Sequence, residues 1–343
     1  MDTIQIGERP VGEDHATYVI AEAGINHDGE LQRAKELIDA AADADADAVK
    51  FQTFRSKKLF VESAAEDDSI LDTFEQLEMP YDWIPTLSEY ADKRGITFLS
   101  TPFDPDSVDA LADYVPAFKI ASSSLTDHRL LRYVAQTGKP MIVSTGVHTR
   151  SEIAEAVAVL EEEEADFALL HCVSSYPTPL DQIRVSMVEQ LNEWFDVQIG
   201  LSDHTEDPVT APTAAVALGA TVVEKHLTTD SSREGADHSM ALEPDELSSM
   251  VDAIRRTESA IGTPYENVHE AEQSAYENSR RSVYATDKLN AGDKLTKSSI
   301  SILRCNGRKR GVPPSQYESL LGKRVVESVE RHSPITESLI EQT

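Results

Sequence analysis

Short apolar runs alternate with amphipathic segments along most of the chain, and this alternation narrows the choice of fold more than any other feature. Several runs are apolar at every position, which is typical of parallel strands that are buried on both faces. Eight strand–helix units in about 260 residues predict an α/β fold of the (β/α)8 or TIM-barrel type. The apolar runs are residues 18–23, 48–51, 96–99, 117–120, 141–143, 167–170, 197–201 and 221–223. The amphipathic segments include residues 31–42, 107–114, 150–162 and 208–218.

A doubly wound sheet is the alternative architecture for such a pattern. Many sheets of that type bind a dinucleotide at a glycine-rich turn that follows the first strand. Here the first run is followed by Ala23-Gly24-Ile25-Asn26, which lacks those glycines. The barrel is therefore favoured, and the doubly wound sheet stays as the alternative.

Polar residues stand at the end of almost every apolar run. Enzymes built on this barrel place their chemistry at the C-terminal ends of the strands. Polar residues at successive strand ends therefore predict a site that lines the whole mouth of the barrel. In chain order these residues are Glu22, Lys50 with Gln52, Thr101, Lys119 with Ser122, Ser144, His171 with Ser174, Ser202 with His204, and Glu224 with His226.

The last two strand ends carry a histidine pair. Because side chains alternate along a strand, Ser202 shares a face with His204, and Glu224 shares a face with His226. Two imidazoles on neighbouring strands can hold one divalent metal ion, so His204 and His226 are candidate metal ligands. The alternative is that each is a hydrogen-bonded core histidine. His171 lies within an apolar run, where a structural role is expected.

The pattern changes after residue 261. Residues 263–279 are polar and begin with Gly262-Thr263-Pro264, so we expect a linker there. Residues 280–343 contain strand-like runs at 282–285, 301–303 and 324–326, separated by turn signals such as 290–293 and 311–314. We predict a barrel domain over residues 1–262, a linker over 263–279, and a small β-rich domain over 280–343.

The charge of the chain excludes some classes of partner. It has 61 acidic and 31 basic residues, which give a formal net charge of −30. A surface of this kind repels nucleic acid and suits a halophilic, high-salt cytoplasm. No apolar stretch approaches the roughly 18 residues of a membrane span, and no signal peptide is evident, so we expect a cytoplasmic protein without membrane contact. The two cysteines, Cys172 and Cys305, are expected to be reduced.

The motifs at the strand ends resemble those of the sialic acid synthases, a family that includes N-acylneuraminate, legionaminate and pseudaminate synthases. The tail resembles the antifreeze-like (SAF) domain that this family carries. The order of the motifs along the whole chain makes the resemblance specific. The matching stretches are residues 20–27, 49–53, 100–104, 119–122, 144–146, 171–177, 202–205 and 224–226.

The resemblance implies a reaction and its partners. The family condenses phosphoenolpyruvate with an open-chain N-acylmannosamine-type or 2,4-diacetamido sugar, and releases phosphate and a nine-carbon keto acid. This makes the expected enzyme a transferase that cleaves the C–O bond of phosphoenolpyruvate. The resemblance also implies a divalent metal ion, Mn²⁺ or Mg²⁺, and a homodimer in which each SAF tail caps the barrel of its partner.

The same resemblance assigns roles to individual residues. The candidate catalytic residues are Glu22, Glu224, His204 and His226, and the two histidines are also the expected metal ligands. The expected phosphoenolpyruvate-binding residues are Lys50, Thr101, Lys119, Ser122, Ser144, Ser174 and Ser202. The expected sugar-binding residues are Glu22, Gln52, Tyr176, Asp237 and Arg304. Without a ligand role, either lysine is explained by an inward salt bridge to Glu22 or Glu224, and Asp237 by a turn.

Some positions depart from the family pattern. Ser124 stands where many relatives have an acidic residue, Ser174 stands where the neuraminate-making members have asparagine, and Cys305 replaces a proline. These changes leave the sugar open. Three other functions also stay open: a 3-deoxy-aldulosonate synthase that uses a phosphorylated aldose, a metal-dependent pyruvate aldolase, and a non-catalytic sugar-binding protein.

Overall fold

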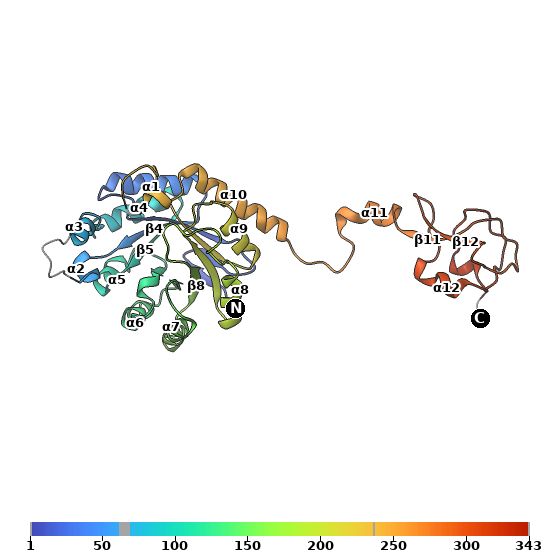
Figure 1. Cartoon of the computed structure of the whole chain (residues 1–343), viewed down its shortest axis with the longest axis horizontal. Helices are drawn as coiled ribbons and strands as arrows, with labels where there is room; N and C mark the ends of the chain where they lie inside the picture. The colour runs from blue at the N-terminus through green and yellow to red at the C-terminus, as the bar shows by residue number, and fades with distance from the viewer. Residues whose placement is uncertain (1, 62–68, 236, 342–343) are drawn as a thin grey trace. The chain divides into compact units, whose positions relative to one another are not determined.

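The computed structural model describes residues 2–61, 69–235 and 237–341. The chain divides into two compact units, Met1–Gly262 and Thr263–Thr343, and we describe each by itself (Figure 1). Among the described residues, no helix combines the length and the apolar character needed to cross a bilayer.

The first unit is a closed barrel of parallel strands, which confirms the predicted TIM-type fold and excludes the doubly wound sheet. Every residue of these strands except Gln52 and Thr97 is buried, as the apolar runs led us to expect. The strands are β3 (Tyr18–Gly24), β4 (Ala48–Thr53), β5 (Thr97–Pro102), β6 (Phe118–Ile120), β7 (Met141–Ser144), β8 (Phe167–Cys172), β9 (Gln198–Asp203) and β10 (Val222–His226).

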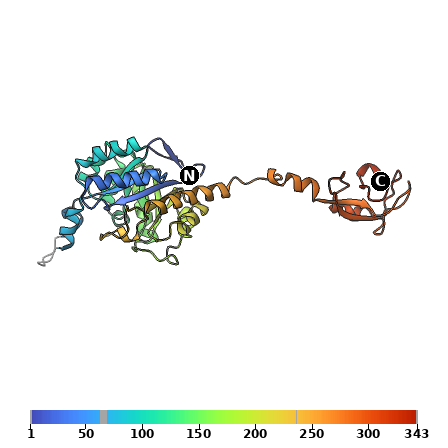
Figure 2. The same cartoon turned by 90° about the horizontal axis from the view of Figure 1, so that it is seen from above.

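Helices surround the barrel, and α1 (Leu31–Asp43) and α10 (Pro244–Ile261) lie side by side on its outer surface (Figures 1 and 2). Two of them differ from the amphipathic segments in the sequence. The segment 107–114 is helical only as α5, which begins at Pro105 because the Asp104 side chain accepts hydrogen bonds from the backbone N–H groups of Asp106 and Ser107. The segment 208–218 is helical as α9.

The outer helices are α1 (Leu31–Asp43), α4 (Trp83–Arg94), α5 (Pro105–Leu111), α6 (His128–Ala135), α7 (Arg150–Glu162), α8 (Met187–Trp194), α9 (Thr210–Ala217) and α10 (Pro244–Ile261). Two shorter helices, α2 (Ser56–Leu59) and α3 (Ser69–Gln76), lie in the connection between β4 and α4.

An antiparallel hairpin, β1 (Ile4–Ile6) and β2 (Arg9–Val11), precedes the barrel. Its apolar side chains belong to the same buried cluster as the barrel-interior residues Ile20, Leu99 and Leu170. The hairpin therefore closes the N-terminal end of the barrel with apolar packing. The C-terminal ends of the strands are left as the end at which polar chemistry can be placed.

The second unit contains an antiparallel pair, β11 (Arg281–Ala285) and β12 (Ile300–Arg304), together with helices α11 (Gln273–Asn278) and α12 (Tyr317–Leu320). The expected strand at 324–326 is wrong. The backbone N–H of Val325 bonds to Asp293, whereas that of Val326 bonds to Leu339, so this stretch alternates between two neighbours and forms only isolated bridges.

The segment 263–279 contains α11, and all of its residues except Tyr276 are exposed. The guanidinium groups of Arg280 and Arg310 lie 4.6 and 4.8 Å from the centre of the Tyr276 ring. The thiol of Cys305 donates to the carbonyl oxygen of Glu277 at 2.9 Å. These contacts join α11 to the β11–β12 unit, and they give Cys305 and Arg310 partners within that unit.

Candidate active site

A cavity of about 360 Å³ opens among the C-terminal ends of the barrel strands. Most of the site residues expected from the sequence line it, and they come from all eight strands or from the residues that directly follow them. The lining residues are Glu22, Lys50, Gln52, Thr101, Phe103, Lys119, Ala121, Ser122, Ser144, Cys172, Tyr176, Ser202, His204, Glu224 and His226.

Two lysines and two glutamates form a buried charge cluster in this cavity. Lys50 Nζ lies 2.6 Å from Glu22 Oε2 and 3.6 Å from Glu224 Oε2. Lys119 Nζ lies 3.6 Å from Glu224 Oε1 and donates to Ser144 Oγ at 2.6 Å. The salt bridges considered as an alternative for the lysines are thus present, but both ammonium groups still face the cavity.

The carboxyl groups of Glu22 and Glu224 have different surroundings, which act differently on their pKa values. Burial raises the pKa of Glu22 above its ordinary value, although the Lys50 ammonium opposes this effect. Burial acts in the same sense on Glu224, but Lys119 and Lys50 outweigh it and hold the pKa of Glu224 below its ordinary value. The pKa values of the two carboxyl groups are therefore shifted in opposite directions.

The pKa values of Lys50 and Lys119 are also shifted in opposite directions. Burial disfavours both ammonium groups, yet Glu22 and Glu224 outweigh it at Lys50 and raise the pKa of that side chain. Burial prevails at Lys119 and lowers its pKa, because the carboxylate of Glu224, 3.6 Å away, does not outweigh burial and the charge of Lys50. Lys119 is thus the less neutralised cation of the two.

Hydroxyl groups complete a cradle around the ammonium groups. Thr101 Oγ1 accepts from Lys50 Nζ at 3.2 Å, and Ser202 Oγ donates to Glu224 Oε1 at 3.0 Å. Ser122 Oγ accepts from the backbone N–H of Gly146 at 3.0 Å. A Cβ at Gly146 would lie 2.5 Å from Ser174 Oγ and 2.8 Å from Ser122 Oγ, so only glycine allows this approach. Ser174 packs here, although it does not line the cavity.

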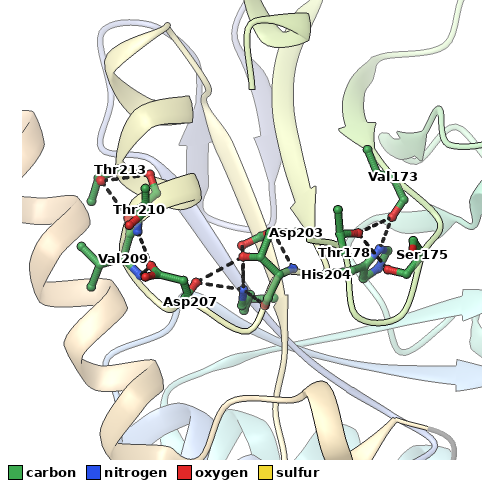
Figure 3. Close-up of polar contacts among 11 residues, drawn as sticks. Val173, Ser175, Thr178, Asp203, His204, Asp207, Val209, Thr210 and Thr213 are labelled. Carbon is green, nitrogen blue, oxygen red and sulfur yellow. Dashed lines mark hydrogen bonds and ion pairs between the residues drawn. The ribbon is translucent and has the colours of Figure 1, made fainter. Parts of the chain in front are cut away.

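The histidine pair lies beside this cradle, with ring centroids 5.3 Å apart. His204 Nδ1 lies 2.8 Å from the carbonyl oxygen of Val173, which leaves Nε2 for a ligand (Figure 3). His226 Nδ1 is buried and has no hydrogen-bond partner among the described residues. Burial, followed by the charge of His204, lowers the pKa of His226 well below its ordinary value, so its imidazole is neutral.

This donor set fits a divalent cation. His226 is a neutral imidazole with an unpartnered buried nitrogen, which is a metal-ligand type, and His204 has a backbone carbonyl on one ring nitrogen, which is the usual orienting contact. At His204 burial lowers the pKa, but the Cys172 thiol and the Val173 carbonyl outweigh it and raise the pKa above its ordinary value. In the described part of the chain, no group of three His, Cys, Asp or Glu side chains is placed to hold a metal.

The expected sugar contacts lie towards the outer part of the cavity. The Tyr176 ring, which is 55% exposed, lies 4.2 Å from the His204 ring between centroids. Gln52 donates to Glu22 Oε1 at 3.0 Å. Asp237 Oδ2 lies 3.6 Å from His226 Nδ1, and burial, followed by the charge of Glu22, raises the pKa of Asp237 to about 6.

Three expected residues stand apart from the lining, and three lining residues were not expected. Ser174 packs against Gly146, Asp237 lies beside His226, and Arg304 is the last residue of β12 in the second unit. Cys172, Phe103 and Ala121 line the cavity without having been predicted. Strand alternation could have identified Cys172, because His171 faces outward, with Nε2 2.6 Å from the Ile183 carbonyl oxygen.

Two parts of the chain match models of known protein families. Residues 37–266 match the NeuB family and residues 280–341 match the SAF domain. The chain is 39% identical to the spore coat polysaccharide biosynthesis protein SpsE of Bacillus subtilis, over 96% of this chain and 95% of that protein. It is 36% identical to the N,N'-diacetyllegionaminic acid synthase of Campylobacter jejuni, over 90% and 95%. The N-acetylneuraminic acid synthetase structure from Leptospira borgpetersenii matches with a TM-score of 0.76 and 34% identity, over 80% and 95%.

Proposed function

Because this chain belongs to the NeuB family and carries a SAF domain, we propose that it is a nonulosonic acid synthase that condenses phosphoenolpyruvate with an N-acylated amino sugar and water. Its products are a nine-carbon keto sugar acid and phosphate, which makes it a transferase. The observation that carries the proposal is the convergence of two buried lysines, two carboxyl groups and a histidine pair on one cavity.

Phosphoenolpyruvate has two anionic groups, a carboxylate and a phosphate. Anions of this kind are bound by charge-assisted hydrogen bonds from cations and hydroxyl groups. Lys119 and Lys50 supply the charge, and Thr101, Ser122, Ser144 and Ser202 surround them with hydroxyl groups. Lys119 serves the ligand more directly, because the carboxylate of Glu22 already occupies Lys50 at 2.6 Å.

The reaction joins C3 of phosphoenolpyruvate to the aldehyde carbon of the open-chain sugar. The aldehyde oxygen takes a proton, and the oxygen of water adds to C2. The bond between C2 and the phosphate oxygen then breaks, so that phosphate leaves and C2 becomes the ketone. Overall, one proton of the water passes to the sugar hydroxyl group and the other leaves with phosphate or solvent.

Glu22 and Glu224 are the carboxyl groups that can move these protons. Carboxyl groups whose surroundings drive their pKa values apart commonly divide the acid and base roles. Glu22, with its raised pKa, is the proton carrier for the reacting oxygens. Glu224 stays ionised, orients Ser202, and balances the charge of Lys119 and Lys50.

We further propose that His204 and His226 hold a divalent cation, Mn²⁺ or Mg²⁺. Such an ion supplies Lewis-acid polarisation of the sugar aldehyde and a site for water. Tyr176, beside both histidine rings, would cover the sugar and limit access of bulk water.

The proposed function is tested with the purified protein in high salt. We would incubate it with MnCl2, phosphoenolpyruvate, and either N-acetylmannosamine or a 2,4-diacetamido-trideoxyhexose, and follow phosphate release together with the mass of the keto acid. Bridging ¹⁸O at C2 of phosphoenolpyruvate should appear in the released phosphate, and a chelator should stop the release. Release with a phosphorylated aldose alone would instead favour the 3-deoxy-aldulosonate synthase, and no release with any sugar would contradict the proposal.

We also propose the homodimer that the family resemblance implies, in which Arg304 of one chain serves the barrel of the other. The test mixes two variants of reduced activity, Lys119→Met and Arg304→Ala, after joint unfolding and refolding. In a swapped dimer, each mixed pair has one site with both native residues, so activity returns. If each tail serves its own barrel, every site lacks one residue and no activity returns.

A further inference from the structure

A buried ion pair lies on the outer face of the barrel wall, directly behind the candidate site. Asp203 on β9 and Lys225 on β10 are partners in the strand register, and their side chains are 0% and 1% exposed. The distance from Lys225 Nζ to Asp203 Oδ2 is 2.6 Å. Neither residue lines the cavity, whereas their neighbours Glu224 and His226 do.

Both charged side chains make hydrogen bonds to the segment that follows β9, which Figure 3 shows between Asp203 and Asp207. Lys225 Nζ donates to Thr205 Oγ1 and to the carbonyl oxygen of Asp207, both at 3.2 Å, and also to the carbonyl oxygen of Thr205. Asp203 accepts from the backbone N–H of Thr205 at 2.9 Å and from its hydroxyl group at 3.0 Å. The ammonium group thus holds residues 203–207 at several points.

His204 lies inside this turn. Its ring is held by the Val173 carbonyl oxygen at 2.8 Å, and its own carbonyl oxygen accepts from the backbone N–H of Thr178 at 2.8 Å. One side of His204 is therefore fixed by the loop after β8, and the other side by the Lys225–Asp203 pair.

We propose that Lys225 and Asp203 are positioning residues that fix the place of His204 at the active site. The part of this inference that concerns metal binding rests on the proposed function. Residues that orient a metal ligand from behind commonly change metal affinity or activity about 10- to 100-fold when they are replaced.

Stability does not account for the pair. Removing two charges from water costs about as much as their attraction returns, so a neutral pair of the same shape is often equally stable. A buried network in which every donor and acceptor is used instead favours one local geometry. The geometry favoured here is that of the turn that carries His204.

The test is the double variant Asp203→Asn with Lys225→Met, which removes both charges and keeps the approximate shapes. It avoids the single variants, in which one buried charge would lose its partner and the protein could fail to fold. A milder variant, Thr205→Val, removes one acceptor of Lys225 and one donor to Asp203.

A matched control lies at the opposite end of the barrel. Asp47 accepts from the backbone N–H of Val19 at 2.8 Å and pairs with Arg255 at 3.1 Å, so like Asp203 it has a backbone donor and a basic partner, and its second partner, Arg9, is half exposed to solvent. The control is therefore Asp47→Asn with Arg255→Met. It has a similar loss of charge but no connection to His204.

Three quantities are measured for the full chain: hydrogen–deuterium exchange of peptides that cover residues 203–209, Mn²⁺ affinity by calorimetry, and the kinetics with phosphoenolpyruvate. For Asp203→Asn with Lys225→Met we expect faster exchange in this segment, a Mn²⁺ Kd raised about tenfold or more, and kcat lowered about tenfold or more. The KM for phosphoenolpyruvate should change less than about threefold, because Lys50 and Lys119 are untouched. Thr205→Val should move in the same direction by a smaller amount.

Unchanged exchange and unchanged Mn²⁺ affinity in the double variant would overturn the inference, as would equal losses in the control. Failure of the proposed function gives a different result. In that case the wild-type protein releases no phosphate from phosphoenolpyruvate, while the exchange experiment still decides whether the pair fixes the segment.

Discussion

Lys119 and Lys50 lie in the same cavity, but the carboxylate partner of Lys119 is more distant. The effect of this difference on the use of phosphoenolpyruvate can be measured. The nearest carboxylate of Lys119 is 3.6 Å away, whereas that of Lys50 is 2.6 Å away. Loss of one hydrogen bond to a charged group costs about 1.5–3 kcal/mol. We therefore expect Lys119→Met to lower kcat/KM for phosphoenolpyruvate about 10- to 100-fold. Steady-state kinetics with the sugar saturating would measure this loss.

A control for this variant is Lys139, which precedes β7 at the N-terminal end of the barrel. Its ammonium group donates to the carbonyl oxygen of Val115 at 2.6 Å, away from the cavity. Lys139→Met should leave the kinetics with phosphoenolpyruvate unchanged even if it lowers stability. An equal loss of kcat/KM in both variants would mean that Lys119 acts on the fold rather than on the ligand.

His27 makes stability depend on pH. Burial, which outweighs the charge of Asp28, lowers the pKa of His27 from the usual 6.5 to about 4. The unfolded chain takes up this proton near pH 6.5, but the folded chain does so only near pH 4. Stability should therefore fall as the pH falls from about 7 to about 4, by about 3 kcal/mol in total from this group. Urea unfolding at pH 7.5 and 5.0 in the presence of a chelator would measure it.

The variant that isolates this effect is His27→Asn, because an asparagine oxygen can replace Nδ1 as the acceptor for the backbone N–H of Gly29. It should be less stable than the wild type at pH 7.5 but should lose about 2 kcal/mol less on going to pH 5.0. The exposed His15 provides the control, since His15→Asn should keep the wild-type slope. A wild-type slope in His27→Asn would refute the assignment.

At the scale of elements, the sequence predicted the existence of the barrel strands correctly but not the residues at which they end. The apolar runs marked all eight barrel strands, but several ended before the strands did. β8 continues through His171 to Cys172, and β10 continues to His226. Hydropathy marks the packed layers of the barrel, whereas the backbone ladder continues into the polar mouth.

Other elements could not be foreseen from local pattern. The β1–β2 hairpin depends on a tertiary contact, because its few apolar residues become meaningful only against the barrel interior. The stretch 324–326 has strand-like composition but no continuous partner. The segment around Asp237 carries no periodic signal, so its nearness to His226 is a result of tertiary folding alone.

The hairpin has its own measurable consequence. Ile6 is 1% exposed and packs in the cluster that closes the N-terminal end of the barrel. Ile6→Ala should lower the free energy of unfolding by about 2–4 kcal/mol, because it leaves a cavity. The KM for phosphoenolpyruvate should not change, since the site is at the other end. Ile261→Ala, at a position that is 55% exposed, should cost less than about 0.5 kcal/mol, and an altered KM in Ile6→Ala would contradict this view.

At the scale of the whole molecule, the two units can be followed separately. Both tryptophans, Trp83 and Trp194, belong to the unit that ends at Gly262, so their fluorescence reports the unfolding of the barrel alone. Circular dichroism also reports the second unit. This separation allows the effect of charge to be assigned to the barrel rather than to the chain as a whole.

The net charge of −30 predicts a stability that depends on salt. Acidic side chains repel one another across the surface, and the range of this repulsion falls from about 10 Å at 0.1 M salt to about 3 Å at 1 M. We therefore expect the Tm from tryptophan fluorescence to rise steeply with KCl up to about 1 M and then to flatten, with NaCl giving the same curve. Sucrose, which is uncharged, should produce no such steep initial rise. If sucrose reproduced the curve, or if the gain were linear to high KCl, exclusion of solute from the surface rather than screening of charge would be the cause, and the acidic surface would need another explanation.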